Sequence, residues 1–430
     1  MNIHIHTFGC RLNQYESEKI SFELKNMGAN ITELKNADAI AINTCTVTND
    51  SDKKLINYLD KLENISQKKI FLIGCYVSKK ESLIKENSKN EENLFNKENI
   101  TIIPNDKKEE ASQIIFNTLT KNYESEFKNP IFFPQEQSRA YLKIQDGCEV
   151  FCSYCIVARV RGKHKSVEPK KIYDAIKIAY EYGYKEIVLT GLNLGSYNYN
   201  NEIKFIQIVK NMLEISSKFG IRIRLSSIEP IYFNDELISL FKNSEVLCPH
   251  AHIPLQSGSD KILKLMNRRY TRENYLNIVE KLYKTNSNIG ISADIMVGFP
   301  NEDSNDFKDT YNLCEKSKFI KMHIFRYSNR ENTPSSKMSN QIGYRTKLKR
   351  AKLLNELNNK MKDDFYKNAI NRELKVIAEK KLENNYYIGT SGEYLKVKFK
   401  SEKIIEKKDI IKVKAIKYED NIIIGEAKNG

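Results

Sequence analysis

The stretch Gly147-Cys148-Glu149-Val150-Phe151-Cys152-Ser153-Tyr154-Cys155 places three thiols in one short loop, directly after a strand-like run at residues 140–144. Three thiolates from one loop can ligate three irons of a four-iron cluster and leave the fourth iron open to a substrate. A structural zinc site needs a fourth ligand, and the local candidate, His164, lies nine residues beyond Cys155, outside the spacing of zinc motifs. A zinc site and three ordinary buried cysteines are therefore the alternatives to a cluster.

Strand-like runs continue beyond this loop and alternate with amphipathic stretches. They lie at residues 186–190, 221–225, 250–253, 290–297 and 321–325. Six short strands with intervening helices predict a partial β/α barrel that is open on one side, with the cysteine loop after its first strand.

The N-terminal part of the chain carries a second set of three cysteines. Cys10, Cys45 and Cys75 each follow a short strand-like run, and no Cys or His stands beside them as a fourth ligand. Alternating strands and helices predict a parallel α/β sheet, whose strand ends meet at one edge. The three thiols would gather there as a second set of cluster ligands, with simple burial of all three as the alternative.

The C-terminal part returns to closely spaced strand-like runs, which predict a small antiparallel β-barrel preceded by a basic helix over residues 345–370. Residues 341–430 hold 22 Lys and Arg against 13 Asp and Glu, a net charge of +9 out of +15 for the chain. Such a surface suits an anionic partner, although a solvated Lys-rich surface explains the charge equally well.

Length and composition fit this layout. A chain of 430 residues is long enough for two or three domains, and we predict them at 1–128, 136–365 and 370–430. Neither a secretory signal nor a membrane-spanning apolar run is present, so we expect a cytoplasmic protein with no membrane role. In a reducing compartment the eight cysteines cannot form a disulfide framework, and Cys248 and Cys314, which lack partners, are expected to be ordinary buried thiols.

The central loop resembles the signature of the radical S-adenosylmethionine (SAM) enzymes. The resemblance implies that Cys148, Cys152 and Cys155 hold a 4Fe-4S cluster whose open iron binds SAM and delivers the electron that cleaves it to a radical. It also implies that residues at the later strand ends face SAM. These are Tyr154, Thr190, Gly191, Asn193, Arg224, Ser226, Gln256 and Asp294.

The two cysteine sets and the C-terminal barrel together resemble the methylthiotransferase family over almost the whole chain. The resemblance implies a second 4Fe-4S cluster, at Cys10, Cys45 and Cys75, that carries the sulfur added to the substrate, and the use of two SAM molecules. It further implies an RNA-binding barrel of the TRAM type, a tRNA anticodon loop as partner and a reducing electron-donor protein. We expect the protein to work as a monomer.

The target is suggested by Asn13-Gln14-Tyr15-Glu16-Ser17, which is most similar to the family branch that modifies carbon 2 of threonylcarbamoyladenosine next to the anticodon. Isopentenyladenosine in tRNA and an aspartate of a ribosomal protein are the targets of the other branches. An iron–sulfur RNA-binding sensor without turnover is the non-enzyme alternative. One departure is that residues 157–162 lack the proline and aromatic residue that the family usually has before Arg161-Gly162.

Overall fold

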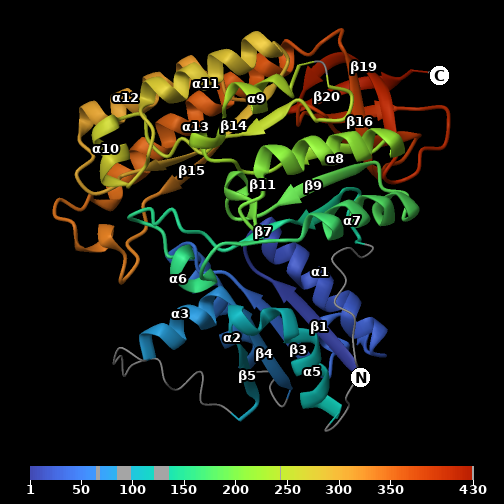
Figure 1. Ribbon diagram of the computed structural model, residues 1–430, viewed down its shortest axis with the longest axis vertical. Helices are drawn as coiled ribbons and strands as arrows, with labels where there is room; N and C mark the ends of the chain where they lie inside the picture. The colour runs from blue at the N-terminus through green and yellow to red at the C-terminus, as the bar shows by residue number, and fades with distance from the viewer. Residues whose placement is uncertain (64–67, 85–97, 121–134, 243, 429–430) are drawn as a thin grey trace. The chain divides into compact units, whose positions relative to one another are not determined.

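The computed structural model describes residues 1–63, 68–84, 98–120, 135–242 and 244–428 (Figure 1). The chain divides into two compact units, each built from several segments. Unit 1 comprises Met1–Phe133, Asp146–Lys165 and Ser328–Ser336, and unit 2 comprises Pro134–Gln145, Ser166–Tyr327 and Lys337–Gly430. The central cysteine loop therefore belongs to the same unit as the N-terminal cysteines. The first predicted domain boundary falls mostly outside the described residues, and the predicted domain limits stay predictions.

Unit 1 is built on a parallel five-stranded sheet in the order β2-β1-β3-β4-β5. The order in which strands are added to the sheet reverses between β1 and β3, and open α/β sheets bind ligands outside the strand ends at such a point. The strands are β1 (Asn2–Thr7), β2 (Asn30–Ile31), β3 (Ala39–Thr44), β4 (Lys69–Gly74) and β5 (Ile100–Ile103), and the helices are α1 (Arg11–Asn26), α2 (Asn49–Glu63), α3 (Cys75–Ile84), α5 (Ala111–Thr120) and α6 (Val157–Arg161).

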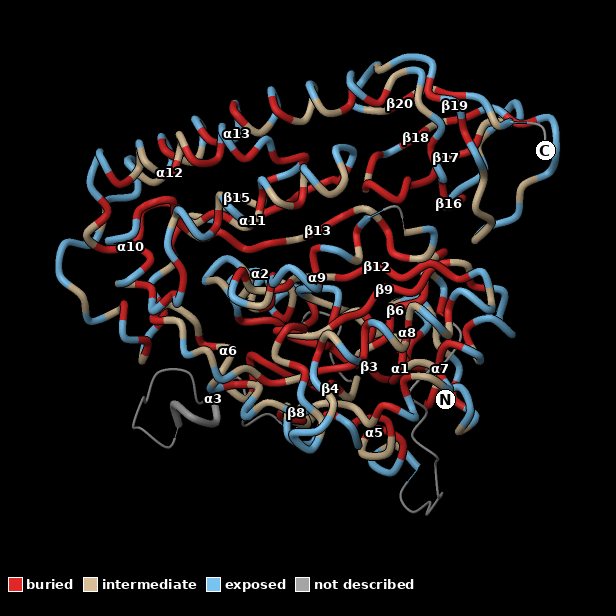
Figure 2. The backbone as a smooth tube through the Cα atoms, turned by 45° about the horizontal axis from the view of Figure 1, so that its top comes forward, coloured by how far each residue is buried: buried red, intermediate tan, exposed pale blue. Residues whose placement is uncertain are grey.

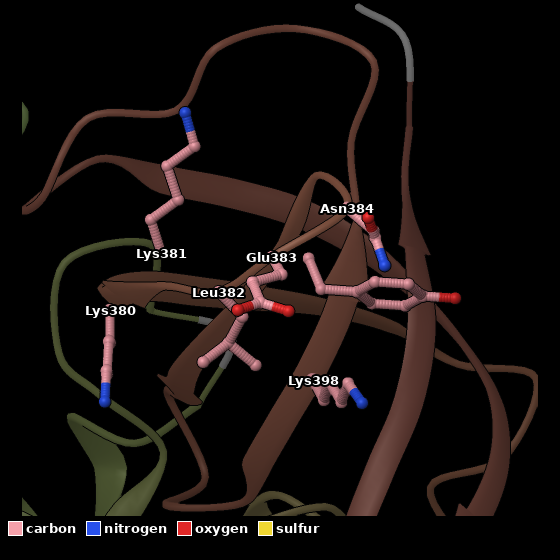
Figure 3. A pocket seen from close by; sticks show the side chains of 7 residues that line it. Lys380, Lys381, Leu382, Glu383, Asn384 and Lys398 are labelled. Atoms are coloured by element: carbon pink, nitrogen blue, oxygen red, sulfur yellow. The ribbon is translucent and has the colours of Figure 1, made fainter.

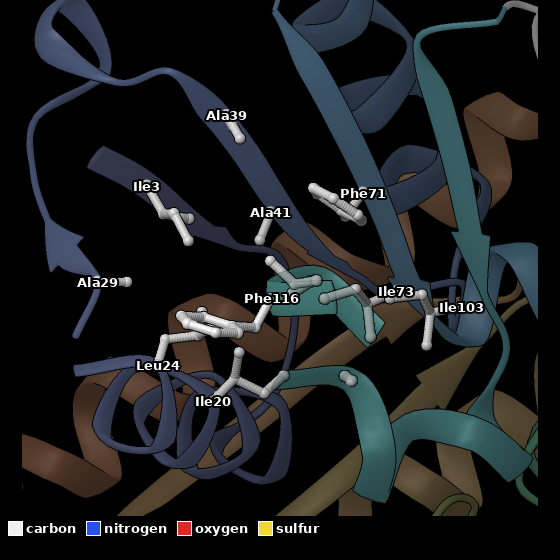
Figure 4. Packing of buried hydrophobic residues seen from close by; sticks show 12 residues of the cluster. Ile3, Ile20, Leu24, Ala29, Ala39, Ala41, Phe71, Ile73, Ile103 and Phe116 are labelled. Carbon is white, nitrogen blue, oxygen red and sulfur yellow. The ribbon is translucent and has the colours of Figure 1, made fainter. Parts of the chain in front are cut away.

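Both faces of this sheet are apolar. Successive residues of a strand point to opposite sides, and the consecutive residues of β3 are apolar on both. On β3, Ala39 and Ala41 pack with Leu24 of α1 and Phe116 of α5, as Figure 4 shows. The alternate residues of the strand pack against α2 on the other face, in a cluster that includes Ile40, Ile42, Leu55 and Leu59. Burial on both faces explains why these strands read as continuous apolar runs.

Unit 2 contains the predicted partial barrel. Two parallel three-stranded sheets, β12-β9-β6 and β13-β14-β15, are joined by isolated bridges such as Ser227 to His252. The strands are β6 (Ala140–Lys143), β9 (Glu186–Thr190), β12 (Arg222–Leu225), β13 (His250–His252), β14 (Gly290–Val297) and β15 (Lys321–Arg326), with the short hairpin β10 (Asn198–Tyr199) and β11 (Ile203–Lys204). The helices are α7 (Pro169–Glu181), α8 (Phe205–Phe219), α9 (Asp235–Ser239), α10 (Asp260–Leu265), α11 (Arg272–Thr285), α12 (Ser304–Ser317) and α13 (Tyr344–Lys367). Short strands β7 (Gln145–Asp146) and β8 (Lys165–Ser166) lie where the chain passes between the units.

The C-terminal part of unit 2 is a closed barrel of five strands in the order β16-β17-β18-β20-β19. Its strands are β16 (Glu373–Lys381), β17 (Tyr386–Ser391), β18 (Lys396–Lys400), β19 (Ile410–Glu419) and β20 (Ile422–Ala427). All neighbours are antiparallel except β18 and β20, which pair in parallel. An odd number of strands cannot alternate in direction around a closed ring, so the predicted antiparallel barrel needs this one parallel pair.

Burial follows the expected pattern in both units. In Figure 2, β9 and β12 are red along their whole length, whereas α13 changes colour along its length because only one stripe of it is covered. None of the helices in the described part of the chain is long and apolar enough to cross a membrane.

Candidate cluster-binding sites

The three N-terminal cysteines lie together at the carboxyl edge of the unit 1 sheet. Cys10 caps the start of α1 after β1, Cys45 follows β3, and Cys75 is the first residue of α3 after β4. Burial raises the pKa of the Cys45 thiol, and the nearby charges of Cys10 and Cys75 raise it further against an opposing hydrogen bond from the Val47 backbone. The carboxyl ends of the parallel strands β1, β3 and β4 thus bring three thiols to one edge of the sheet.

A glycine allows this close approach. Gly9 has a φ of +108°, and a Cβ built on it would lie 2.6 Å from Cβ and 2.9 Å from Sγ of Cys45. The next turn is held by Asn13, whose buried side-chain amide donates to the carbonyls of Phe8 at 2.8 Å and Thr44 at 3.0 Å. The Asn13 side chain thus joins the backbone of the loops that carry Cys10 and Cys45.

The central loop is compact and folds back on itself. The Cys155 amide donates to the Cys152 carbonyl at 3.0 Å, and the Cys148 amide donates to the Gly162 carbonyl at 3.3 Å. Gly147, with a φ of +71°, passes so close to Lys163 that an added Cβ would lie 1.9 Å from its carbonyl oxygen. The Val157 amide donates to Cys155 Sγ at 3.4 Å, a contact that stabilises a thiolate.

Both triads fit an iron–sulfur cluster better than a single metal ion. All eight cysteines are free thiols, and Cys148, Cys152 and Cys155 are half-buried. Three thiolates suit a four-iron cluster with one open iron, whereas a structural zinc needs a fourth ligand. Tyr154 is half-buried within the central loop, and Cys248 and Cys314 are buried outside both triads.

The predicted SAM-facing loop after β9 carries two unsatisfied oxygens. Gln145 Oε1 accepts from the amides of Leu192 and Asn193, both at 2.9 Å, and a Cβ on Gly191 would lie 2.8 Å from the same atom. Thr190 Oγ1 and Asn193 Oδ1 are buried and have no hydrogen-bond partner among the described residues. Buried polar atoms of this kind normally have a partner, so these two oxygens are candidate acceptors for a polar ligand such as SAM.

A polar cluster lies on the strands at the other side of the barrel. His252 Nε2 lies 3.2 Å from Asp294 Oδ2, and ligand atoms of His252, Asp294 and His323 all lie within 4.8 Å of one another. Burial alone would raise the pKa of Asp294, but the hydrogen bond from His252 and the charges of His252, His323 and Arg268 lower it. An ionised Asp294 can accept hydrogen bonds from a ligand. His252 and His323 were not among the predicted site residues.

Two more predicted SAM contacts lie at neighbouring strand ends. Ser226 is half-buried directly after β12. Gln256 is held in the left-handed region, with a φ of +64°, and its amide donates to the Asp294 carbonyl at 2.8 Å. Such a conformation is uncommon for a residue other than glycine and is enriched at functional sites.

Arg224 has a different set of partners from the one expected of a SAM contact. Its Nε donates to Glu186 at 2.7 Å, and its two terminal nitrogens donate to the carbonyls of Gly392 at 2.9 Å and Ser391 at 3.0 Å. The side chain is buried and joins the partial barrel to the C-terminal barrel within unit 2. Arg224 is the predicted SAM contact that the geometry supports least.

Glu186 is the acceptor on which this connection depends. It is fully buried and also receives the Arg222 side chain at 2.6 Å. Burial alone would raise the pKa of Glu186, but the charges of Arg222, Arg224 and Arg139 lower it from 4.5 to about 2. Because the folded-state pKa is depressed, the stabilisation is complete above pH 4.5 and is lost as the pH falls towards 2.

We expect Glu186→Gln to lower the free energy of unfolding by about 3–5 kcal/mol, because it leaves two buried guanidinium groups without a counter-charge. The exposed Glu214 on α8, which pairs with Lys218 at 3.2 Å, provides the matched control. Glu214→Gln should change stability by no more than about 0.5 kcal/mol in the same denaturant titration. Equal stability of the two variants would contradict the role given to Glu186.

Three lysines and one acidic residue, Glu383, line a hollow of the C-terminal barrel. Lys380, Lys381 and Lys398, with Asn384 and Tyr386, line a hollow of about 650 Å³ (Figure 3). The Lys398 ammonium lies 4.9 Å from the centre of the Tyr386 ring. Cations beside an aromatic ring form a surface that suits a phosphate backbone with a neighbouring base.

Arg161 was not predicted as a site residue. It follows the central loop as the last residue of α6, and its Nε lies 3.3 Å from Cys75 Sγ of the N-terminal triad. The sequence signal for it is the Arg-Gly pair after the central loop, but no spacing rule connects that pair to Cys75.

Comparison with known proteins matches both parts of the chain. Residues 142–314 match the Radical SAM superfamily, and residues 2–96 match the Uncharacterized protein family UPF0004. A Bacillus subtilis protein named threonylcarbamoyladenosine tRNA methylthiotransferase MtaB is 34% identical over 425 residues, which cover 96% of this chain and 93% of that protein. A Thermotoga maritima protein of the same name is 33% identical over 94% of this chain and 92% of its own length.

Relatives with a second name are similarly close. A Pelagibacter ubique protein named tRNA-2-methylthio-N(6)-dimethylallyladenosine synthase is 32% identical over 91% of this chain and 90% of its own length. Among solved structures, the radical SAM methyltransferase TsrM from Kitasatospora setae, with cobalamin and a 4Fe-4S cluster bound, aligns with a TM-score of 0.56. That alignment covers 78% of this chain and 76% of TsrM at 9% identity, so it supports the fold alone.

Proposed function

This chain belongs to the MtaB-type family of radical SAM methylthiotransferases, and from that premise we propose that it adds a methylthio group to carbon 2 of threonylcarbamoyladenosine next to the tRNA anticodon. Membership makes the chain an enzyme that uses SAM and an iron–sulfur cluster and acts on tRNA. The choice of nucleoside rests on the Bacillus and Thermotoga MtaB relatives, whose matches cover 96% and 94% of this chain against 91% for the Pelagibacter relative. The motif Asn13-Gln14-Tyr15-Glu16-Ser17 supports the same branch.

We propose that the two thiol triads hold two 4Fe-4S clusters with different tasks. When bound, the group at Cys148, Cys152 and Cys155 would supply one-electron cleavage of SAM, and the group at Cys10, Cys45 and Cys75 would supply the sulfur. An unactivated aromatic C–H bond needs such cofactors, because no side-chain base or nucleophile can break it. The count of two SAM molecules, one for the methyl group and one for the radical, belongs to this proposal.

The protein's own residues orient the reactants. The buried oxygens of Thr190 and Asn193 are free to accept hydrogen bonds from SAM, and the ionised Asp294, held by His252, can accept from its ammonium or ribose groups. Gly191, Ser226, Gln256 and Tyr154 complete the proposed SAM contacts. Arg224 belongs to the proposal only weakly, since its donors are engaged by Glu186 and the C-terminal barrel.

We propose that the anticodon loop is the part of tRNA that binds. The hollow of the C-terminal barrel supports this, because Lys380, Lys381 and Lys398 can neutralise phosphates while Tyr386 offers a stacking surface. The basic helix α13 adds further cations. A separate reducing protein would supply the electrons to a monomeric enzyme.

The choice of nucleoside is tested with purified, anaerobically reconstituted protein, SAM and dithionite. Two tRNA substrates are compared, one carrying threonylcarbamoyladenosine and one carrying isopentenyladenosine. We expect the methylthio product on the first at a rate at least tenfold higher, measured by mass spectrometry of the nucleosides. Preference for the second would move the chain to the branch of the Pelagibacter relative.

Two other outcomes bear on the remaining alternatives. Failure to form 5′-deoxyadenosine when both clusters are intact would favour an iron–sulfur RNA-binding sensor. Turnover without modification of either tRNA would favour the ribosomal protein aspartate as target.

A further inference from the structure

Arg161 connects the segment that carries the central triad to the N-terminal triad of the same unit. It follows Cys155 by six residues and is the last residue of α6. Its side chain is only 3% exposed, although it carries a full charge. A buried arginine is costly unless its donors are used, so its partners define what it does.

Every described partner of this guanidinium is polar or charged. Nε donates to Cys75 Sγ at 3.3 Å, and one terminal nitrogen donates to Asn13 Oδ1 at 2.6 Å. The other terminal nitrogen donates to Glu16 at 2.6 Å and, more weakly, to Asp146 at 3.4 Å. Thus a residue anchored just after the central triad contacts both a thiol of the N-terminal triad and the amide that orders the Cys10 and Cys45 loops.

A second connection also joins the central loop to the N-terminal cysteine loops. In the segment Ser328–Ser336, Arg330 donates to Thr46 Oγ1 at 2.5 Å, beside Cys45, and the Ser335 amide donates to the Ser153 carbonyl at 2.9 Å, between Cys152 and Cys155. Arg330 also pairs with Asp52 at 2.9 Å. This segment ties the two loops through residues next to the thiols, whereas Arg161 touches a thiol directly.

We propose that Arg161 is a positioning residue that fixes the spacing of the two cluster loops and stabilises the Cys75 thiolate as a ligand. Hydrogen bonds and positive charge at a ligand sulfur favour the reduced, more negative state of a cluster and so raise its reduction potential. Outer contacts of this kind also hold the ligand in the orientation that binding requires. The inference rests on the proposed presence of a cluster at the N-terminal triad.

The potential is measured in the full chain with Cys148, Cys152 and Cys155 replaced by alanine, which leaves only the N-terminal triad. In this background we expect Arg161→Gln to shift the reduction potential to more negative values and to speed loss of iron to a chelator several-fold. Arg161→Lys keeps the charge but cannot bridge Cys75 and Asn13. Compared with Arg161→Gln, it should show a smaller shift of the reduction potential but nearly the same rate of iron loss. The exposed Arg159 on the same helix is the matched control, and Arg159→Gln should change neither quantity.

A second readout uses the otherwise unchanged enzyme. If Arg161 sets the spacing of the loops, Arg161→Gln should raise the ratio of 5′-deoxyadenosine to methylthio product several-fold, which loss of folded protein alone would not do. An unchanged potential and an unchanged ratio in folded Arg161→Gln would overturn the inference, and so would equal effects of Arg159→Gln. If the Gln variant does not fold, Arg161→Lys decides by the same two readouts. If the background protein with intact Arg161 binds no iron, the proposed second cluster falls, and the inference falls with it.

Discussion

Replacing Cys45 by alanine is expected to abolish methylthio transfer while 5′-deoxyadenosine continues to form. Cys45 is a buried member of the N-terminal triad and packs against Gly9, and its proposed role is to ligate the cluster that supplies the sulfur. Loss of a ligand should cost more than the roughly 10–100-fold that removal of an outer contact costs. Product nucleoside and 5′-deoxyadenosine are measured in the same anaerobic reaction.

The matched control for Cys45→Ala is Cys314→Ala. Cys314 is a buried thiol on α12, outside both triads, and burial alone raises its pKa. Both variants remove one buried sulfur, but only the first removes a proposed ligand. Methylthio product at wild-type levels from Cys45→Ala would show that this triad does not supply the sulfur.

Replacing Cys152 by alanine is expected to abolish both products. Cys152 lies at the centre of the central loop, where its carbonyl accepts from the Cys155 amide, and the loop retains this backbone contact without the thiol. With only two thiols left at this site, SAM cleavage should fall by more than about 100-fold. The two variants therefore differ in one quantity, the 5′-deoxyadenosine that Cys45→Ala keeps and Cys152→Ala loses. Persistent 5′-deoxyadenosine in Cys152→Ala would contradict the task given to the central triad.

Much of the architecture could be predicted because it depends on local pattern. The buried strands β3 and β4 appear as apolar runs, and each of the three N-terminal cysteines follows a strand. Parallel strands place their ends at one edge, so sequence order alone predicted that these thiols would gather. The β/α alternation of the partial barrel and the basic helix α13 were predicted for the same reason.

Contacts between distant segments could not be predicted in this way. Arg161 and Cys75 are 86 residues apart, and Arg330 and Thr46 are 284 apart, so no periodicity connects them. Arg224 was predicted as a SAM contact from its place near a strand end, whereas its partners in the structure are Glu186 and the C-terminal barrel. The parallel pair β18 and β20 likewise follows from closing a ring of five strands, which strand patterns do not reveal.

The central claim is that this enzyme methylthiolates threonylcarbamoyladenosine in tRNA. The nucleoside mass profile of tRNA from cells that lack the gene, compared with the same cells complemented by the intact gene or by the Cys45→Ala form, tests it most directly. We predict that 2-methylthio-threonylcarbamoyladenosine disappears in the deletion, that its unmodified precursor accumulates, and that only the intact gene restores it. Unchanged levels of this nucleoside in the deletion would contradict the account. Loss of the methylthio form of isopentenyladenosine instead would contradict it as well.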